Sequence, residues 1–362
     1  MQEHGGNLQA ARQVYGDLDF LDYSANINPL GPPPGVFTAI QQNLAQIIHY
    51  PDPQGTGLKQ ALGQRLGVSR ENLILGNGAV ELIYLLAQAL KPQKALIPVP
   101  AFSEYAKAIR AVDGTVRYHF LRPEDGFRLT GEDLELEGCD ILFVCSPNNP
   151  TGQLLAEKDF ALILARAEKA GVFVVLDESF MDFVEPARQW RAFKYLNRYS
   201  GLFVLYSLTK FYAIPGLRLG CGIGSPTLIQ RLYELKDPWN VNSLALAAGR
   251  AALTDEAYAV DTRQLIRSER EFLITGLSKL QGLKPVAGEA NFILVKNAAS
   301  LKGGSLVDAL GKMGILIRSC SNFPGLGDDY FRIAVHDREK NNKLLHSLGT
   351  VLSQGTEVDT GV

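Results

Sequence analysis

Short apolar runs alternate with stretches of helical periodicity from about residue 70 to residue 225, and this alternation constrains the fold more than any other feature. The runs are rich in Val, Ile, Leu and Phe throughout, which is typical of strands buried on both faces. Strands of this kind form a mostly parallel sheet covered by helices, so the pattern predicts an α/β fold. The expected strands are residues 73–75, 95–99, 141–145, 172–176 and 202–206, and the expected helices are residues 79–90, 102–112 and 157–170.

The length of the chain, 362 residues, suits one large domain and a smaller one. Residues 243–280 favour helix and contain no proline, so they could connect the two domains. Beyond them, the strands expected at residues 291–295 and 331–335 indicate an α+β layer. The predicted parts are an N-terminal arm over residues 1–35 that joins the small domain, a large domain over residues 36–260 and a small C-terminal domain over residues 261–362.

The composition is ordinary for a globular protein, with 46% hydrophobic residues, 20% charged residues and a formal net charge of -2. There is no basic excess to favour nucleic acid, no apolar run as long as a membrane span and no signal-peptide pattern. The four cysteines and five histidines show no metal-ligand spacing, so we expect no metal site. Cysteines scattered in this way indicate reduced thiols and a cytoplasmic protein.

Polar motifs follow several of the expected strands. In a mostly parallel sheet, ligands bind at the carboxyl ends of the strands. We therefore expect motifs that lie far apart in the sequence to meet at this edge of the sheet. They are Gly76-Asn77-Gly78, Ser146-Pro147-Asn148-Asn149, Asp177-Glu178-Ser179 and the segment from Ser207 to Lys210.

Lys210 follows the buried strand 202–206 and lies among small and hydroxyl residues. Desolvation at such a position lowers the pKa of a lysine and frees its amine as a nucleophile. This is the condition for a covalent bond to the aldehyde of pyridoxal phosphate, whose phosphate Ser207 and Arg218 could hold. Taken alone, the segment is explained equally well by a lysine that extends from a strand end into solvent.

Asp177 ends the apolar strand 172–176, where a carboxylate needs a partner. The protonated pyridine nitrogen of the cofactor is one suitable partner, and a helix cap or a structural ion pair is the alternative. Asn149 lies in the turn Pro147 to Gly152 and could donate to the ring hydroxyl of the cofactor, although a plain turn also explains the composition.

Gly78 and Ala79 join an expected strand to an expected helix. Glycine lets the backbone approach an anion, and a helix N-terminus offers free N–H groups, so the cofactor phosphate is the expected ligand. Phe102 follows the next strand and could stack on the pyridine ring. An ordinary turn and an ordinary core aromatic are the alternatives at these two places.

Together and in this order, these motifs resemble the fold-type I pyridoxal-phosphate enzymes, the aspartate aminotransferase superfamily. The segment His49-Tyr50-Pro51-Asp52-Pro53-Gln54 is similar to the histidinol-phosphate aminotransferase branch. Four further segments are similar to the L-threonine-O-3-phosphate decarboxylases of cobalamin biosynthesis, and the resemblance covers about residues 4 to 350. These segments are residues 4–7, 23–31, 207–220 and 317–326.

The resemblance implies an aspartate aminotransferase-like fold and specific contacts to the cofactor. Lys210 would hold the cofactor covalently, Asp177 would pair with its pyridine nitrogen, and Asn149 would pair with its ring hydroxyl. The groups implied for the cofactor phosphate are Ala79, Val80, Ser207 and Arg218.

The resemblance also implies a homodimer and a phosphorylated amino acid as substrate. Tyr50 would reach across the dimer interface to the cofactor phosphate of the partner subunit. Asn149 and Arg332 would also bind the substrate, Arg332 through the substrate carboxylate. The residues implied for the substrate's own phosphate are His4, Asn26 and Arg318.

The implied reaction is the decarboxylation of L-threonine O-3-phosphate to (R)-1-amino-2-propanol O-2-phosphate and CO2. Phe180 stands where aminotransferases of this branch usually carry a tyrosine, which favours the decarboxylases. A histidinol-phosphate aminotransferase and a decarboxylase of L-serine O-phosphate remain alternatives, the latter differing by one methyl group worth only ~1 kcal/mol. A non-catalytic pyridoxal-phosphate regulator is a third, but intact Lys210, Asp177 and Arg332 argue against it.

Overall fold

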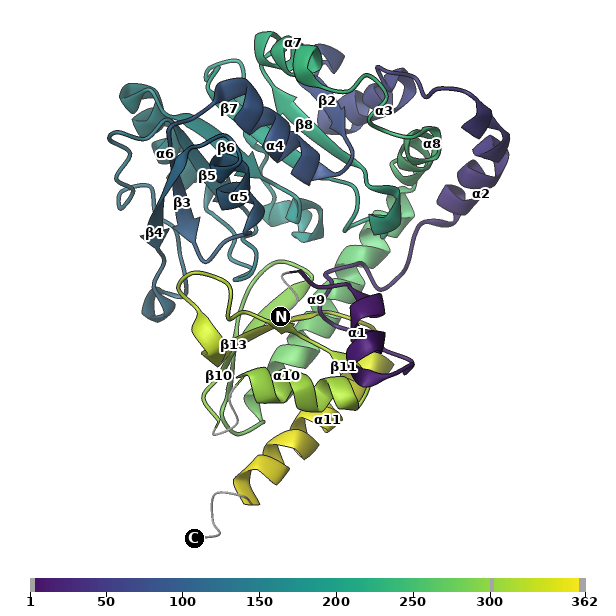
Figure 1. Cartoon of the computed structure of the whole chain (residues 1–362), viewed down its shortest axis with the longest axis vertical. Coiled ribbons are helices and arrows are strands. Elements are labelled where there is room, and N and C mark those ends of the chain that lie inside the picture. The colour runs from purple at the N-terminus through teal and green to yellow at the C-terminus, as the bar shows by residue number, and fades with distance from the viewer. Residues whose placement is uncertain (1–3, 300–302, 358–362) are drawn as a thin grey trace.

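The computed structural model describes residues 4–299 and 303–357 and has a large domain and a small domain. Figure 1 shows the large domain above the small one, with helix α9 (Glu256–Ser278) running between them. Within the described residues, no helix is both long enough and apolar enough to cross a membrane.

The large domain is built on a seven-stranded sheet in the order β2-β8-β7-β6-β5-β3-β4. Only β8 runs antiparallel to its neighbours, so the predicted mostly parallel α/β sheet is confirmed. In sheet order the strands are β2 (Leu73–Gly76), β8 (Gly220–Gly224), β7 (Leu202–Ser207), β6 (Phe173–Asp177), β5 (Ile141–Cys145), β3 (Lys94–Val99) and β4 (Thr115–Phe120).

Helices cover both faces of this sheet. One face packs against α4 (Ala79–Leu90), α5 (Glu104–Arg110) and α7 (Pro226–Leu235), which share a single apolar core with it. The other face packs against α3 (Thr56–Leu66), α6 (Glu157–Ala170) and α8 (Ser243–Ala252). Helix α2 (Pro34–Asn43) lies beside α8 at the periphery (Figure 1).

The small domain carries an antiparallel sheet in the order β12-β13-β10-β9. Its strands are β12 (Arg318–Ser319), β13 (Tyr330–Ala334), β10 (Phe292–Asn297) and β9 (Leu283–Val286), and its helices are α10 (Gly303–Lys312) and α11 (Arg338–Glu357). Short 3₁₀ helices occupy Leu44–Ile48, Arg70–Asn72, Pro123–Asp125, Met181–Phe183, Pro186–Arg188, Ala192–Tyr195, Pro215–Leu217 and Gly327–Asp329.

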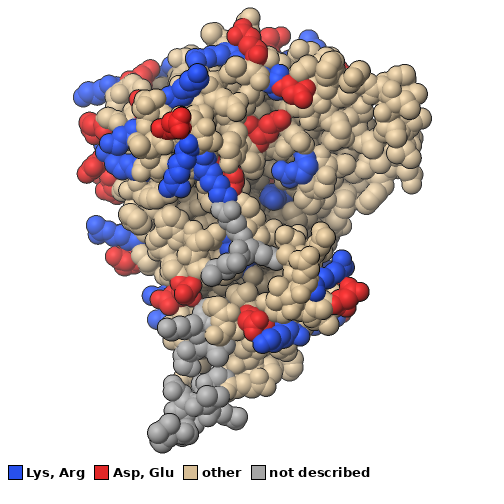
Figure 2. Space-filling model, viewed as in Figure 1, with Lys and Arg blue, Asp and Glu red and all other residues tan. Residues whose placement is uncertain are grey.

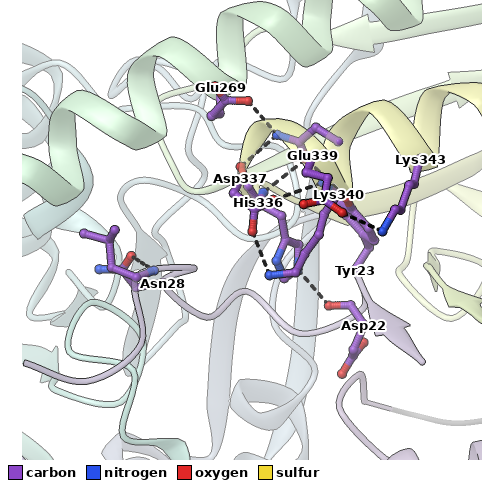
Figure 3. A network of polar contacts seen from close by, with 11 residues as sticks. Asp22, Tyr23, Asn28, Glu269, His336, Asp337, Glu339, Lys340 and Lys343 are labelled. Carbon is purple, nitrogen blue, oxygen red and sulfur yellow. Dashed lines mark hydrogen bonds and ion pairs between the residues drawn. The ribbon is translucent and has the colours of Figure 1, made fainter. Parts of the chain in front are cut away.

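The N-terminal arm lies against the small domain. It contains helix α1 (Leu8–Tyr15) and strand β1 (Leu21–Asp22), which pairs in parallel with β11 (Ile315–Leu316). Figure 3 shows the polar network that holds the arm there. The hydroxyl of Tyr23 donates to Asn341 Oδ1 at 3.3 Å, and His336 Nε2 lies 3.0 Å from the carbonyl oxygen of Asp22. The segment around Asp22 and Tyr23 is thereby fixed to the small domain, whose strands β12 and β13 carry Arg318 and Arg332.

Candidate active site

A cavity of about 590 Å³ opens at the carboxyl ends of the large-domain strands, a volume typical of small-molecule sites. Basic side chains lie inside the hollow between the two domains in Figure 2. The large domain lines the cavity with Ala79, Val80, Phe102, Asn149, Asp177, Ser207, Lys210 and Arg218, and the arm and small domain line it with His4, Asn26, Arg318 and Arg332.

Two of the predicted residues do not line the cavity. Gly78 is not among the lining residues, although it lies next to Arg218, which is. Tyr50 lies on the surface, 78% exposed, and stacks on Trp239 with ring centroids 4.4 Å apart. Its predicted contact requires a second subunit and stays a prediction.

Lys210 is partly buried just beyond the end of β7, and it faces the cavity. Burial lowers the pKa of its amine to about 8, and the positive charges of Arg332 and Arg218 act in the same direction. A larger share of neutral amine at physiological pH makes Lys210 a competent nucleophile toward an aldehyde.

Asp177 ends β6 at the floor of the cavity and is 5% exposed. Its Oδ2 accepts a hydrogen bond from the hydroxyl of Tyr105 at 2.7 Å, and its Oδ1 accepts from the backbone N–H of Ser179 at 2.9 Å. Burial raises the pKa of Asp177, while these two hydrogen bonds oppose the rise. A cationic ring nitrogen in the cavity would complete the environment of this carboxylate.

Tyr105 was not among the residues selected from the sequence. It is fully buried on α5 and stacks on Phe143 with ring centroids 5.1 Å apart. Its position three residues after Phe102, one turn of helix away, is the signal that could have revealed it.

A cradle for an anion forms where β2 meets α4. The backbone of Gly78 has φ +84° and ψ 161°, a conformation that only glycine adopts readily, and it precedes α4, whose first residues, Ala79 and Val80, line the cavity. The hydroxyl of Ser207 lies 2.8 Å from that of Thr209. Arg218 has a left-handed backbone with φ +54°, which is uncommon for arginine. Helix N–H groups, hydroxyls and a guanidinium together suit a phosphate.

Arg318 and Arg332 lie directly opposite each other on β12 and β13, and both are 6% exposed. Arg332 donates through Nη1 to Asn149 Oδ1 and through Nη2 to the carbonyl oxygen of Ser24 at 2.8 Å. Its buried Nε has no hydrogen-bond partner within the described part of the chain, and burial lowers the pKa of Arg332 to about 10. A donor left over in this way fits a carboxylate in the cavity.

His4 and Asn26 bring the arm to the mouth of the cavity. His4 Nε2 donates to Glu104 Oε1 at 2.8 Å, a contact that the sequence did not suggest. Asn26 is 4% exposed, and its Oδ1 accepts no hydrogen bond from any described residue. Within residues 4–299 and 303–357, no cluster of three or more His, Cys, Asp or Glu side chains could hold a metal ion.

The family model for aminotransferase class I and II matches residues 19–348, which is most of the chain. The chain belongs to this family. It is 39% identical over 355 residues to the threonine-phosphate decarboxylase of Salmonella typhimurium. That alignment covers 97% of this chain and 96% of the relative.

Solved structures of the same family superpose closely on this one. The histidinol-phosphate aminotransferase of Clostridium acetobutylicum has a TM-score of 0.86 at 32% identity, covering 92% of this chain and 99% of that one. The L-threonine-O-3-phosphate decarboxylase of Porphyromonas gingivalis has a TM-score of 0.83 at 26% identity, covering 91% and 99%. Both activities are therefore represented among proteins with this fold.

Proposed function

We propose that this protein is a pyridoxal-phosphate-dependent decarboxylase that converts L-threonine O-3-phosphate to (R)-1-amino-2-propanol O-2-phosphate and CO2 in cobalamin biosynthesis. The observation that carries the proposal is the pair of buried arginines, Arg318 and Arg332, which lie opposite each other on neighbouring strands and both line the cavity. Two adjacent buried cations favour a substrate with two anionic groups. Threonine phosphate has a carboxylate and a phosphate in one molecule.

The residues of the cavity fit pyridoxal phosphate. Lys210 would hold its aldehyde carbon, Asp177 its pyridine nitrogen and Phe102 one face of its ring. The groups for its phosphate are Ala79, Val80, Ser207 and Arg218, together with the backbone of Gly78, beside which the guanidinium of Arg218 lies. When bound, the cofactor supplies an electron sink for a bond broken at the substrate Cα.

The protein's own residues then decide which bond that is. Arg332 would bind the substrate carboxylate and, through its contact with Asn149, fix it relative to the ring. His4, Asn26 and Arg318 would hold the substrate phosphate at the other end. A substrate held at both ends has one orientation of its Cα bonds relative to the ring. In the proposed orientation the bond from Cα to the carboxylate is the one that breaks, and the carboxylate leaves as CO2. Lys210 is placed to deliver the proton that replaces the carboxylate at Cα.

A histidinol-phosphate aminotransferase is the second candidate, and the 32% identity to such an enzyme keeps it in view. Histidinol phosphate has a hydroxymethyl group in place of the carboxylate, so it supplies only one anion for the two arginines. Phe180 also argues for the decarboxylase. It is buried edge-on against Phe292 with ring centroids 5.0 Å apart, and it offers no hydroxyl to a cofactor.

We further propose that the protein works as a homodimer in the cytoplasm. Exposed apolar side chains gather around α2 and the segment that follows it, which is unusual for a monomer. They are Phe37, Leu44, Ile47, Ile48 and Tyr50. An interface there would bring Tyr50 to the partner subunit, as its predicted role requires.

A side-by-side assay tests the proposed reaction. Protein loaded with pyridoxal phosphate is incubated with threonine phosphate, serine phosphate and histidinol phosphate, each with and without 2-oxoglutarate. We expect CO2 and aminopropanol phosphate from threonine phosphate, independent of 2-oxoglutarate. A product that forms from histidinol phosphate only when 2-oxoglutarate is present would reject the decarboxylase in favour of the aminotransferase.

A further inference from the structure

Glu104, at the start of α5, is a buried carboxylate that lines the cavity and has no role in the proposed reaction. Its Oε1 accepts hydrogen bonds from His4 Nε2 at 2.8 Å and from Lys107 Nζ at 2.9 Å, and its Oε2 accepts from the hydroxyl of Tyr84 at 2.9 Å. Burial acts to raise the pKa of Glu104, but the hydrogen bonds from Lys107 and Tyr84 outweigh it and lower the pKa. The carboxylate is therefore ionised and held from both sides.

Glu104 and His4 come from different parts of the molecule. His4 belongs to the arm, which the network of Figure 3 fixes to the small domain. The arm doubles back at Gly5 and Gly6: the N–H of Gly6 donates to Ser24 Oγ at 2.9 Å, and a Cβ on Gly5 would lie 2.1 Å from the carbonyl oxygen of Ser24. Glu104 belongs to the large domain. Their hydrogen bond thus connects the arm to the large domain beside the cavity.

Tyr84 connects Glu104 to helix α4, which begins at the proposed site of the cofactor phosphate. It lies on α4, whose first residues, Ala79 and Val80, line the cavity at the anion cradle. Phe102 lies next to His4, with ring centroids 5.8 Å apart. The imidazole of His4 is therefore held at its edge by Glu104 and flanked by an aromatic ring that also lines the cavity.

We propose that Glu104 is a positioning residue that holds His4 at the cavity mouth so that the imidazole can bind the phosphate of the substrate. The inference rests on the proposed function, because it takes the substrate to be phosphorylated and His4 to be one of its ligands. With Nε2 donating to Glu104, Nδ1 is the ring atom left for a phosphate oxygen, and it donates to that oxygen in the imidazolium form, in which both ring nitrogens carry a proton. Preorganisation of this kind strengthens binding, because the arm is ordered before the substrate arrives.

A double-mutant cycle with Glu104→Gln and His4→Gln tests the inference in the cofactor-loaded enzyme. Loss of one charge-assisted hydrogen bond is expected to raise the KM for threonine phosphate about tenfold in Glu104→Gln, with kcat changed less than about twofold. In the His4→Gln background, Glu104→Gln is expected to change KM by less than about twofold, because its effect passes through His4. Equal increases in both backgrounds would overturn the proposal.

Amide hydrogen exchange gives a readout that does not depend on catalysis. We expect the arm segment from residue 4 to residue 16 to exchange faster in Glu104→Gln, and the sheet of the large domain to exchange as in the wild type. Unchanged exchange in the arm would contradict the proposal that Glu104 holds the arm through His4. Exchange that rises throughout the protein would mean that Glu104 only supports the fold. Wild-type protein that is inactive on threonine phosphate refutes the proposed function, while the exchange result still decides whether Glu104 holds the arm.

Glu157→Gln is the matched control. Glu157 begins α6, accepts a hydrogen bond from the hydroxyl of Tyr195 at 2.8 Å and pairs with Lys194, so it resembles Glu104 in its partners but lies away from the cavity. We expect this variant to change neither the KM for threonine phosphate nor the exchange of the arm. An equal effect of the two variants would mean that the response is not specific to the His4 contact.

Discussion

Replacing Gly78 with alanine should weaken cofactor binding by an amount that the structure allows us to estimate. A Cβ on residue 78 would lie 2.5 Å from Arg218 Nη2, too close for the two atoms to coexist, so the guanidinium must move. Loss of one charged hydrogen bond to the cofactor phosphate costs ~1.5–3 kcal/mol, which corresponds to about 10- to 150-fold weaker binding. The backbone at φ +84° and ψ 161° adds a folding cost of ~1–3 kcal/mol for any residue other than glycine.

Gly16 provides a control for the backbone term. It has nearly the same conformation, φ 86° and ψ -178°, but nothing lies within 4 Å of the position of its Cβ. Gly16→Ala should therefore lose a similar free energy of unfolding and bind the cofactor as the wild type does. Gly78→Ala should lose free energy of unfolding and also bind the cofactor more weakly.

The assay is a titration of the cofactor-free protein with pyridoxal phosphate, followed by absorbance, beside urea unfolding of the same samples. The comparison of the two variants separates the strain of the backbone from the displacement of Arg218. If Gly78→Ala binds the cofactor as tightly as Gly16→Ala, then Arg218 does not hold the phosphate and the proposed cradle is wrong.

Two further predictions concern the floor of the cavity. The rate of cofactor capture by the cofactor-free protein should rise with pH and level off above about pH 8, because the neutral amine is the nucleophile and burial holds the pKa of Lys210 at about 8. Stopped-flow absorbance that gives a midpoint near the ordinary lysine value of 10.5 would contradict this. Tyr105→Phe should lower the free energy of unfolding of the cofactor-free protein by ~1–3 kcal/mol, because Asp177 loses a buried donor, and an unchanged urea midpoint would count against that contact.

The strands and helices with strong local patterns could be predicted from the sequence. The expected helices at residues 79–90 and 157–170 coincide with α4 and α6, and the expected strand at residues 141–145 coincides with β5. Continuous apolar runs identify strands that are buried on both faces, which explains this agreement.

The edge and the glycine-rich parts of the sheet could not be predicted in this way. Strand β4 lies at the edge and mixes polar with aromatic residues, so it has no continuous apolar run. Strand β8 has the sequence Gly-Cys-Gly-Ile-Gly, which has a low propensity for β-structure. Packing against the neighbouring strand requires glycine at residue 222, because a Cβ there would lie 2.2 Å from the ring of Phe203. Such a requirement appears only when the neighbouring strand is in place.

Residues 243–280 favour helix in the sequence, and in the structure they form two helices rather than one. Helix α8 ends at Ala252, and α9 begins after Asp255, whose side chain accepts from the N–H of Tyr258 at 2.9 Å. This is an N-cap, and Asp255 could have been recognised as one from the sequence. The hydrogen bonds of Tyr105 with Asp177 and of Glu104 with His4 could not have been recognised in this way, because the partners are 72 and 100 residues apart in the sequence.

The opposed positions of Arg318 and Arg332 have a consequence for substrate choice. Neighbouring strands are ~4.8 Å apart, so the sheet fixes the distance between the backbones from which the side chains of Arg318 and Arg332 extend. In the role proposed for them, Arg318 and Arg332 would select substrates by the distance between the two anionic groups of the substrate. Threonine phosphate and serine phosphate have the same number of bonds between carboxylate and phosphate, so they match this distance equally well. Any preference between them must come from the apolar walls, where the extra methyl group makes its contacts.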